Sequence, residues 1–431
     1  MDSTDLRVAF ISEHASPLAT IGGVDAGGQN IAVAELATEL ARSGAQVDIF
    51  TRQSDVSQPA IVQWKPRVRV IHVPAGPRQV IVKEKLLPYM DEFAVNMAQF
   101  IRFQSRSYQL IHAHFFMSGL VALRLRKELG IPFVITFHAL GEVRRLCQGG
   151  SDGFPASRTR IEKMVIGGAD KVVALCPQDR IDLITLYGAA ADSITVIPNG
   201  YSATDFFPVE RILARAEIGL GPYEPVILQL GRMVPRKGVD NVIRAVAELK
   251  QSYSQRPRLL IVGGESPQPD PVITPEIGRL QALACDLGVA DQVTFTGSRS
   301  QQRLRYYYSA ADVFVTTPWY EPFGITPLES MACGTPVIGA AVGGIQHTVL
   351  PGKTGCLVPP NDPALLAGNL YKLLTDASLR QTMSQAAIQH VRAHYTWARV
   401  VRQTISLYES VALSRRWSGP AIRAAIQPAP R

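Results

Sequence analysis

Short apolar runs alternate with amphipathic segments along most of this chain. The first run spans 6–12 and is followed by a glycine-rich loop at 21–30. A helical pattern then covers about 29–43, and four apolar side chains recur on one of its faces: Val33, Leu36, Ala37 and Leu40. A second β-branched run at 46–51 completes a strand–loop–helix–strand unit. This unit is typical of an α/β domain that binds phosphate at its glycine loop.

The same alternation continues through both halves of the sequence. Further strands are predicted at 68–73, 110–113, 133–137, 171–176, 194–198, 226–230, 259–262, 293–296, 313–316, 335–341 and 354–358. Helices are predicted between several of them, at 83–103, 118–129, 239–250, 363–375 and 396–413 among others. The sequence therefore predicts an α/β fold throughout.

The 431 residues are too many for one core, so we expect two domains. Pro198-Asn199-Gly200 is a turn signal, and the family resemblance described below implies that it joins the two domains. The predicted parts are a first domain at 1–198, a second at 199–395, a last helix at 396–414 and a disordered, proline-containing tail at 415–431.

Two glutamates flank the start of one predicted helix. Glu321 follows the strand at 313–316, and Pro322 biases it away from the helical region. The helix is expected to begin near Phe323 or Gly324. One carboxylate would therefore lie outside the carboxyl end of a strand, where open α/β sheets bind ligands.

The second carboxylate, Glu329, projects from that helix. Between the two, the backbone N–H groups of Phe323, Gly324 and Ile325 would form a donor cluster for oxygen-rich ligands. Two fixed carboxylates can accept hydrogen bonds from the vicinal hydroxyls of a sugar or a ribose. The spacing alone is equally compatible with two solvated surface glutamates.

A loop at 231–238 carries two cations after another buried strand. Arg232 offers a bidentate fork and Lys237 a point charge, at the start of the helix predicted from Val239. Together they suit a diphosphate, although two surface cations would produce the same pattern.

Two histidines follow neighbouring strands of the first half. His114 ends the run at 110–113, and His138 ends the run at 133–137. A lone histidine at a strand end is more often structural than catalytic. Two at corresponding positions of one sheet favour a site at its carboxyl edge.

Composition narrows the class of protein. The chain is 46% hydrophobic and 19% charged, with no signal region and no apolar run long enough for a membrane span, so a cytoplasmic location is expected. The five scattered cysteines indicate reduced thiols. The net charge of +8 suits anionic ligands, but contact with anionic membrane or a simple solubility effect stays open. No basic cluster with interleaved aromatics indicates nucleic acid.

The glutamate stretch resembles the E-x7-E segment of retaining GT-B glycosyltransferases of family 4. Its pattern Glu-x-Phe-Gly-x4-Glu, followed by Ala-x-Gly-x-Pro-Val and Gly-Gly, is complete between Glu321 and Gly344. The loop at 231–238 matches the family's Gly-Arg-x4-Lys-Gly, and the first glycine loop is similar to the Asp-x-Gly-Gly-Gln segment of the sucrose-phosphate synthase branch. The resemblance covers nearly the whole chain.

The resemblance implies a GT-B fold, in which two Rossmann-like domains face each other across a cleft and the last helix crosses back to the first domain. It implies a nucleotide-diphosphate sugar as co-substrate, a UDP-sugar above all, with no cofactor and no metal. The donor-binding residues that it implies are Gly27, Gly28, Arg232, Lys237, Gly297, Arg299, Phe323, Gly324, Ile325 and Glu329. His138, Glu321, Arg232 and Lys237 would take the catalytic roles.

The acceptor side is less fully specified. The resemblance implies acceptor contacts from Gln29, Asn30, Lys83, His114 and Arg158. Inositol-phosphate glycosyltransferases have a tyrosine and a threonine where this chain has Phe115 and Ala139, which disfavours inositol phosphate. We expect a small, phosphorylated acceptor, while a lipid or a growing glycan stays open.

Other classes share the expected architecture. A sugar-nucleotide epimerase would turn over the donor without an acceptor, and a phosphorylase would carry a lysine-bound pyridoxal cofactor. A non-catalytic sensor would bind the nucleotide sugar and never release the diphosphate. The sequence favours a transferase and leaves the oligomeric state undetermined.

Overall fold

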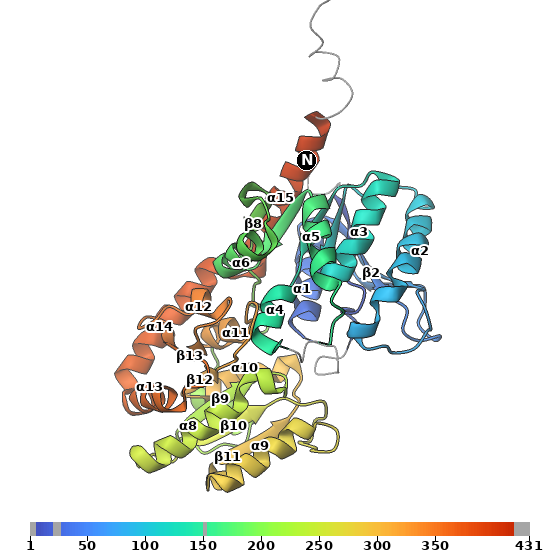
Figure 1. Cartoon of the computed structure of the whole chain (residues 1–431). Coiled ribbons are helices and arrows are strands. Elements are labelled where there is room, and N and C mark those ends of the chain that lie inside the picture. Colours follow the sequence, from blue (N-terminus) through green and yellow to red (C-terminus); the bar gives the residue numbers. More distant parts are fainter. Residues whose placement is uncertain (1–5, 20–26, 150–152, 418–431) are drawn as a thin grey trace, which may run out of the picture.

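The computed structural model describes residues 6–19, 27–149 and 153–417, and within these ranges it forms two lobes (Figure 1). The first lobe is built on an eight-stranded sheet in the order β3-β4-β2-β1-β5-β6-β7-β8, parallel except for β3. Its strands are β1 (Arg7–Ile11), β2 (Gln46–Arg52), β3 (Ile61–Lys65), β4 (Val68–Val73), β5 (Leu110–His114), β6 (Phe133–Thr136), β7 (Lys171–Ala174) and β8 (Ile194–Val196). Its helices are α1 (Gly28–Arg42), α2 (Met90–Arg102), α3 (Phe116–Leu129), α4 (Gly141–Gln148), α5 (Arg158–Gly168) and α6 (Pro177–Tyr187).

The second lobe is built on a six-stranded parallel sheet in the order β11-β10-β9-β12-β13-β14. Its strands are β9 (Val226–Leu230), β10 (Arg258–Val262), β11 (Val293–Gly297), β12 (Val313–Thr316), β13 (Val337–Ala340) and β14 (Gly355–Val358). Its helices are α7 (Arg211–Glu217), α8 (Val239–Ser252), α9 (Pro275–Asp286), α10 (Gln301–Ala310), α11 (Thr326–Ala332), α12 (Ile345–Thr348), α13 (Pro363–Thr375) and α14 (Ala377–His394). Two Rossmann-like domains are thus confirmed.

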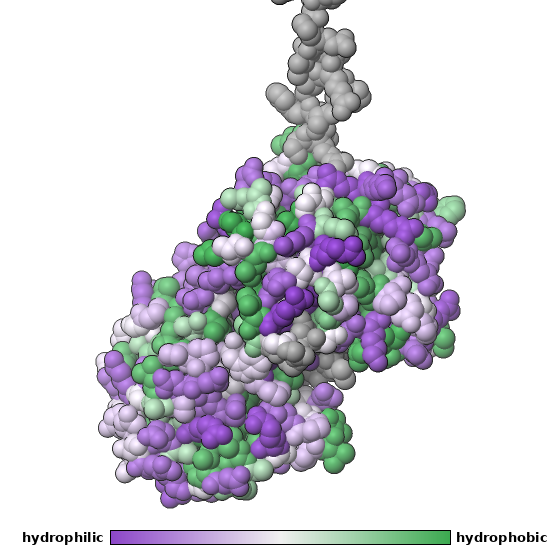
Figure 2. All heavy atoms as spheres, in the orientation of Figure 1, coloured by the Kyte–Doolittle hydropathy of each residue, from purple (hydrophilic) through white to green (hydrophobic). Residues whose placement is uncertain are grey.

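Both faces of each sheet are buried, because parallel strands here are apolar on both sides. In the first lobe, α2, α3 and α5 cover one face, and α1 with α15 (Trp397–Trp417) covers the other. In the second, α10, α11 and α14 cover one face and α8, α9 and α13 the other. On the face shown in Figure 2, polar and apolar residues are mixed over both lobes.

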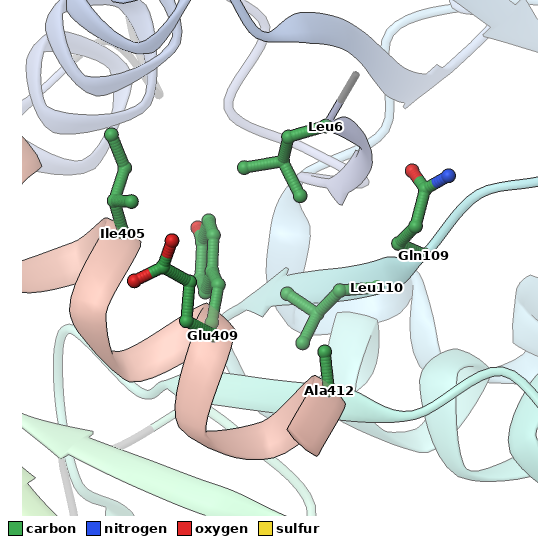
Figure 3. Close-up of a pocket in the computed structure, with 7 residues that line it drawn as sticks. Leu6, Gln109, Leu110, Ile405, Glu409 and Ala412 are labelled. Carbon is green, nitrogen blue, oxygen red and sulfur yellow. The ribbon is translucent and has the colours of Figure 1, made fainter. Parts of the chain in front are cut away.

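Helix α15 crosses from the second lobe to the first, as expected for the last helix. Trp397, Val400 and Tyr408 are buried in the same cluster as β1 and α1. Further along, Ile405 and Ala412 face Leu6 across a small apolar hollow (Figure 3). Helix α15 therefore completes the hydrophobic core that β1 and α1 of the first lobe form.

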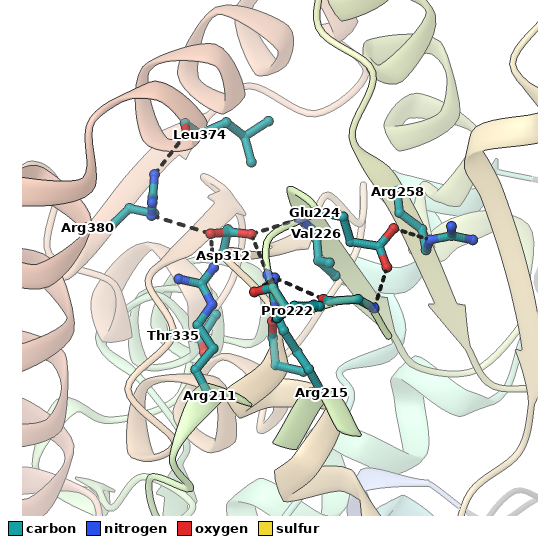
Figure 4. Close-up of polar contacts among 12 residues, drawn as sticks. Arg211, Arg215, Pro222, Glu224, Val226, Arg258, Asp312, Thr335, Leu374 and Arg380 are labelled. Carbon is teal, nitrogen blue, oxygen red and sulfur yellow. Dashed lines mark hydrogen bonds and ion pairs between the residues drawn. The ribbon is translucent and has the colours of Figure 1, made fainter. Parts of the chain in front are cut away.

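A network of charged side chains fixes the amino edge of the second sheet (Figure 4). Asp312, just before β12, pairs with Arg211 and Arg215 of the α7 helix and with Arg380 of α14. It also accepts a hydrogen bond from the N–H of Val226, 2.8 Å away. This edge is opposite the carboxyl ends of the strands and is structural.

Several boundaries differ from prediction. The expected helix at 83–103 is two 3₁₀ turns, Lys83–Lys85 and Leu87–Tyr89, followed by α2, because Pro88 falls inside the segment. Strand β3 and helices α4, α7, α9, α10, α12 and α14 were not predicted. Helix α15 extends to Trp417, into the expected tail, whose remainder lies outside the described residues. No helix in the described ranges has the length and apolar character to span a bilayer.

Candidate active site

The first lobe brings its two predicted histidines together. Strands β5 and β6 are neighbours, so His114 and His138 emerge at the same edge of the sheet. Phe115, directly after His114, and His138 itself have φ values of 86° and 57°. Such conformations are costly for residues other than glycine, and strain of this kind often marks functional sites.

The His114 and His138 rings form a hydrogen-bonded stack. His114 Nδ1 lies 3.0 Å from His138 Nε2, and the ring centroids are 5.2 Å apart. A third ring, His112, stacks on His114 at 4.2 Å and bonds the Tyr408 hydroxyl of α15 through Nδ1. Burial lowers the pKa of His112 and of His138 to about 3, so both rings are neutral at pH 7.

The side chains of Gln29 and Asn30 hold the first lobe's own loops. Gln29 Nε2 donates to the carbonyl of His114, 3.2 Å away, and Asn30 Nδ2 donates to the carbonyl of Ser16 at 3.0 Å. The N–H of Gly27 donates to Asn30 Oδ1. Both residues therefore shape the site's wall at the start of α1. Residues 20–26 of the predicted glycine loop lie outside the described ranges.

The two predicted acceptor cations differ in their surroundings. Lys83 lies in a 3₁₀ turn with its ammonium 3.7 Å from the Glu84 carboxylate. Arg158, at the start of α5, is buried and donates through Nε to Glu162 at 2.8 Å. Its Nη2 donates to the carbonyl of Ala139 at 2.5 Å.

Aromatic rings enclose the Arg158 guanidinium. Its Cζ lies 4.6 Å from the centroid of Phe154 and 5.0 Å from that of Phe115. Its Nη1 is buried and has no hydrogen-bond partner among the residues that the structure describes. An unsatisfied buried donor is costly, so this nitrogen is the part of Arg158 that a ligand oxygen would satisfy.

In the second lobe, Glu321 and Lys237 pair with each other. Lys237 Nζ donates to Glu321 Oε2, and Arg236 Nη1 lies 3.6 Å from the same oxygen. Burial alone would raise the pKa of Glu321, but the charges of Lys237 and Arg236 outweigh it and hold the pKa below its ordinary value. The carboxylate is therefore ionised in a cationic setting.

A tight turn determines the position of Lys237. It ends the 3₁₀ turn Pro235–Lys237, and Gly238 follows with φ of 64°. A Cβ at Gly238 would lie 2.0 Å from the carbonyl oxygen of Thr317, so only glycine fits there.

Glu329 projects from α11 into a buried position. It is 5% exposed and accepts a hydrogen bond of 2.8 Å from the hydroxyl of Tyr308. Burial raises the pKa of Glu329 to about 7, and the negative charges of Asp205 and Glu35 add to the effect. Glu35 belongs to α1 of the first lobe, so a charge of the first lobe also raises the pKa of Glu329 in the second.

The helix after Glu321 begins later than expected. Helix α11 starts at Thr326, with Ile325 at its N-cap and Pro327 inside its first turn. The prediction of a start near Phe323 or Gly324 was wrong, because Gly324 adopts a φ of 88° that interrupts helical geometry. Phe323 and Ile325 are buried beside the α11 helix.

The two lobes approach each other closely at two glycines of the first lobe. A Cβ added at Gly27 would lie 3.9 Å from the Arg232 side chain, and one at Gly28 would lie 3.9 Å from Ile325. The glycine loop of the first lobe thus faces the basic loop and the α11 region of the second, which brings the two predicted halves of the donor site together.

Gly297 and Arg299 lie at the end of β11. Gly297 has φ of 76°, and a Cβ there would be 2.5 Å from the Pro267 carbonyl oxygen. Arg299 donates to that carbonyl at 2.8 Å and to the Tyr307 hydroxyl at 2.9 Å. Both residues fix the loop around Pro267 at the carboxyl edge of the second sheet.

Within the described parts of the chain, no group of three or more His, Cys, Asp or Glu side chains is placed to hold a metal ion. All five cysteines are free thiols. The metal-free site stays a prediction.

Sequence reasoning missed several side chains at this site. Tyr308 lies in an unpredicted helix, and only the fold brings it to Glu329. Arg236 directly precedes Lys237, and His14 lies two residues after the first predicted strand, so position alone could have singled out both. Glu35 is half-buried on α1, and no sequence signal marks it.

Comparison with known proteins gives the family. Residues 27–200 match the glycosyl transferase 4-like domain, and residues 210–390 match the glycosyl transferases group 1 family. The chain belongs to this class of GT-B glycosyltransferases.

Particular relatives include the D-inositol 3-phosphate glycosyltransferases of Corynebacterium efficiens and Acidothermus cellulolyticus. Each is 38% identical, over 94% and 96% of this chain and 95% and 92% of the relative. Among solved structures, the sucrose-phosphate synthase from Thermosynechococcus elongatus superimposes with a TM-score of 0.87 at 35% identity, covering 95% of this chain and 100% of that one. HepE from Anabaena, 20% identical, shares the fold with a TM-score of 0.73 over 94% of this chain and 100% of its own.

Proposed function

We propose that this protein transfers a hexosyl group from a nucleotide-diphosphate sugar, a UDP-sugar above all, to a hydroxyl of a small phosphorylated acceptor. The observation that carries the proposal is the approach of Gly27 and Gly28 to Arg232 and Ile325 across the two lobes. The start of α1, where Gly27 and Gly28 have no side chains, would contact one side of a diphosphate, and the basic loop of Arg232 would contact the other.

The second-lobe residues fit the donor. Arg232 and Lys237 would neutralise the leaving diphosphate, which stabilises charge where it develops. Glu329 would accept hydrogen bonds from the ribose hydroxyls, and Glu321 from the sugar hydroxyls. The residues around Gly297 and Arg299 would flank the base. The backbone of Phe323, Gly324 and Ile325 would border the sugar.

Transfer would proceed with retention and without a protein nucleophile. The acceptor oxygen attacks the anomeric carbon on the face from which the diphosphate leaves. The bond from that carbon to phosphate breaks, and the proton of the acceptor hydroxyl passes to a phosphate oxygen. His138 would support the sugar at the reacting face. The neutral rings of His138 and His114 suit hydrogen bonding rather than a charged role.

The acceptor proposal rests on Lys83 and on the unpartnered Nη1 of Arg158. A phosphate oxygen would satisfy that nitrogen. D-inositol 3-phosphate, named for the relatives, is one acceptor to test. Phe115 and Ala139 offer no hydroxyl to it, so a hexose phosphate is the stronger expectation.

The test is calorimetric titration with UDP, GDP and ADP, followed by turnover. Matching nucleotide sugars would be combined with D-inositol 3-phosphate and hexose phosphates, and released nucleotide would be scored. Release that depends on one phosphorylated acceptor supports the proposal, and the anomeric configuration of the product by NMR decides retention. No nucleotide binding would refute it.

Two other results would assign another class. Donor turnover without an acceptor would indicate an epimerase or a hydrolase. Tight binding with no release under any acceptor would indicate a sensor.

Metal independence is tested separately. We expect EDTA at millimolar concentration to leave the rate within about twofold, because the basic loop supplies the positive charge. Loss of activity that added Mg²⁺ or Mn²⁺ restores would contradict this expectation.

A further inference from the structure

Glu162 is a fully buried carboxylate that the roles above do not use. It lies on α5, one turn after Arg158, and its Oε1 accepts a hydrogen bond from Arg158 Nε at 2.8 Å. Its Oε2 accepts a second hydrogen bond from the Tyr187 hydroxyl at 2.6 Å. The N–H of Gly141 lies 3.1 Å from both oxygens. The elements α4, α5 and α6 therefore place donors around one carboxylate, which satisfies its buried charge.

This network holds the backbone that follows His138. Arg158 Nη2 donates to the carbonyl of Ala139 at 2.5 Å, and Glu162 accepts from the N–H of Gly141. Both contacts fall within three residues after His138, whose φ of 57° is costly for a residue other than glycine. Such a conformation persists only where the surrounding structure enforces it. The Arg158–Glu162 pair therefore helps to keep His138 in place.

The same network leaves one nitrogen of Arg158 for a ligand. Nε and Nη2 make the hydrogen bonds within the network, whereas the buried Nη1 has no hydrogen-bond partner among the described residues. The rings of Phe115 and Phe154 lie against the guanidinium and limit its rotation. A phosphate oxygen bound at Nη1 would therefore act on a group that is already tied to the backbone after His138.

Tyr187, the last residue of α6, holds the Glu162 carboxylate from a third element. Burial, and then the negative charge of Glu162, raise the pKa of Tyr187, so its hydroxyl keeps the proton that it donates to Oε2. The Tyr187 oxygen also accepts a hydrogen bond from the N–H of Glu142 at 2.8 Å. Because the hydroxyl is held from two sides, it fixes the position of the carboxylate between Arg158 and Gly141.

We infer that Glu162 and Tyr187 are positioning residues that link the acceptor's phosphate, bound at Arg158, to the placement of His138 against the donor sugar. The phosphate then increases the rate of transfer as well as the affinity, because the binding energy of a remote group is used at the reacting centre. The inference rests on the proposed function, since it concerns the same acceptor. The competing explanation is structural, in which the network only compensates the buried charges of Arg158 and Glu162.

Kinetics of the full chain with two acceptors separate the two explanations. The phosphorylated acceptor that the protein turns over would be compared with its phosphate-free counterpart. Tyr187→Phe should lower kcat/KM for the phosphorylated acceptor about three- to tenfold, as for one lost hydrogen bond, with kcat itself reduced. The value for the phosphate-free acceptor and the UDP affinity should stay within twofold. Glu162→Gln should act in the same direction and more strongly, because it also removes the charge opposite Arg158.

Tyr223→Phe, at an exposed position, is the matched control and should change neither value. Equal losses for the two acceptors in Tyr187→Phe would support the structural explanation and overturn the inference. No loss for either acceptor, or a loss confined to the acceptor KM, would also overturn it.

An NMR titration keeps the inference testable if no acceptor in the panel is turned over, an outcome that counts against the proposed function. In protein labelled with ¹⁵N-histidine, the signals lost in His138→Gln identify His138. With saturating UDP present to occupy the donor's diphosphate site, inorganic phosphate should shift these signals in the wild type. The shift should be smaller in Tyr187→Phe and absent in Arg158→Gln. Phosphate binding by calorimetry with unmoved His138 signals would overturn the inference alone, whereas no phosphate binding would refute the acceptor proposal as well.

Discussion

At the scale of single residues, the site depends on charges that burial has altered. Glu321 is held ionised by Lys237 and Arg236, whereas Glu329 has a neutral hydroxyl and other carboxylates as neighbours. The same residue type therefore has opposite pKa shifts in the two positions. Each shift leads to a measurement.

Glu329 should make stability depend on pH. Its pKa of about 7 in the folded state exceeds its ordinary value of 4.5, so between these values the folded protein retains a proton that the unfolded chain loses. Stability from this group therefore falls as pH rises through that window. Glu329→Gln should be more stable relative to wild type at pH 8 than at pH 5, by on the order of 2–3 kcal/mol, in urea unfolding.

Asp55→Asn is the control for that experiment. Hydrogen bonds from Ser57 lower the pKa of Asp55 below its ordinary value of 3.8, so this carboxyl is ionised at both pH 5 and pH 8, and the stability of this variant relative to wild type should be the same at the two pH values. An equal effect of Glu329→Gln at both pH values would contradict the raised pKa.

Substitutions at Lys237 and at Glu321 should have different effects on donor affinity and on turnover. Lys237→Ala should weaken UDP binding by about 10- to 100-fold, the loss expected for one charged hydrogen bond, measured by calorimetry. Glu321→Gln should leave UDP affinity within a few fold, because it removes the carboxylate that competes for Lys237, while lowering kcat more strongly. Unaltered UDP affinity in Lys237→Ala would remove the diphosphate role, and unchanged kcat in Glu321→Gln would remove the sugar role.

At the scale of elements, tight turns at the carboxyl edges of the sheets place the functional side chains. Gly238 allows the turn that carries Lys237, and Gly324 allows the one between Glu321 and α11. The sequence predicted the loop that ends at Gly238, but it placed Gly324 near the start of the following helix instead of in a turn before it. Thr326 starts α11 because the positive φ of Gly324 has to be followed by a new helical turn.

Gly238 and Gly219 allow a matched test of this point. Both have positive φ, 64° and 75°, but an added Cβ meets the Thr317 carbonyl only at Gly238 and nothing within 4 Å at Gly219. Gly219→Ala should cost about 1–2 kcal/mol, the backbone contribution alone. Gly238→Ala should cost roughly 3 kcal/mol or more and also weaken UDP binding, because Lys237 moves. Equal costs in chemical denaturation would contradict the steric reason.

At the scale of the whole molecule, α15 links the two lobes. It follows the last helix of the second lobe, and its buried residues belong to the core of the first. The Tyr408 hydroxyl lies 2.7 Å from His112 Nδ1, so the end of the chain also reaches the histidine stack.

Tyr408→Phe tests this connection. The variant keeps the ring in the core but leaves His112 Nδ1 without its buried partner, which should cost about 1–3 kcal/mol in urea unfolding. Tyr223→Phe, at an 89% exposed position, is the control and should change stability by less than about 0.5 kcal/mol. Equal effects of the two variants would show that the hydroxyl at Tyr408 has no structural role.

The sequence by itself determined the alternation of strands and helices, the two-domain division and the main site segments. These signals are local: apolar runs, turn glycines, and the cations of the loop at 231–238 stand close together in the chain. Short helices such as α4 and α7 were not predicted, because a helix of few turns has only a weak periodic pattern of apolar residues.

Only the tertiary structure decided which groups meet. Lys237 and Glu321 are far apart in sequence, as are His112 and Tyr408, and Gly27 faces Arg232 from another domain. No sequence pattern fixes such pairs, because parallel strands from distant segments bring their carboxyl ends to one edge only after the sheet forms. The same holds for the pKa shifts of Glu321 and Glu329, since burial and neighbouring charge exist only in the folded chain.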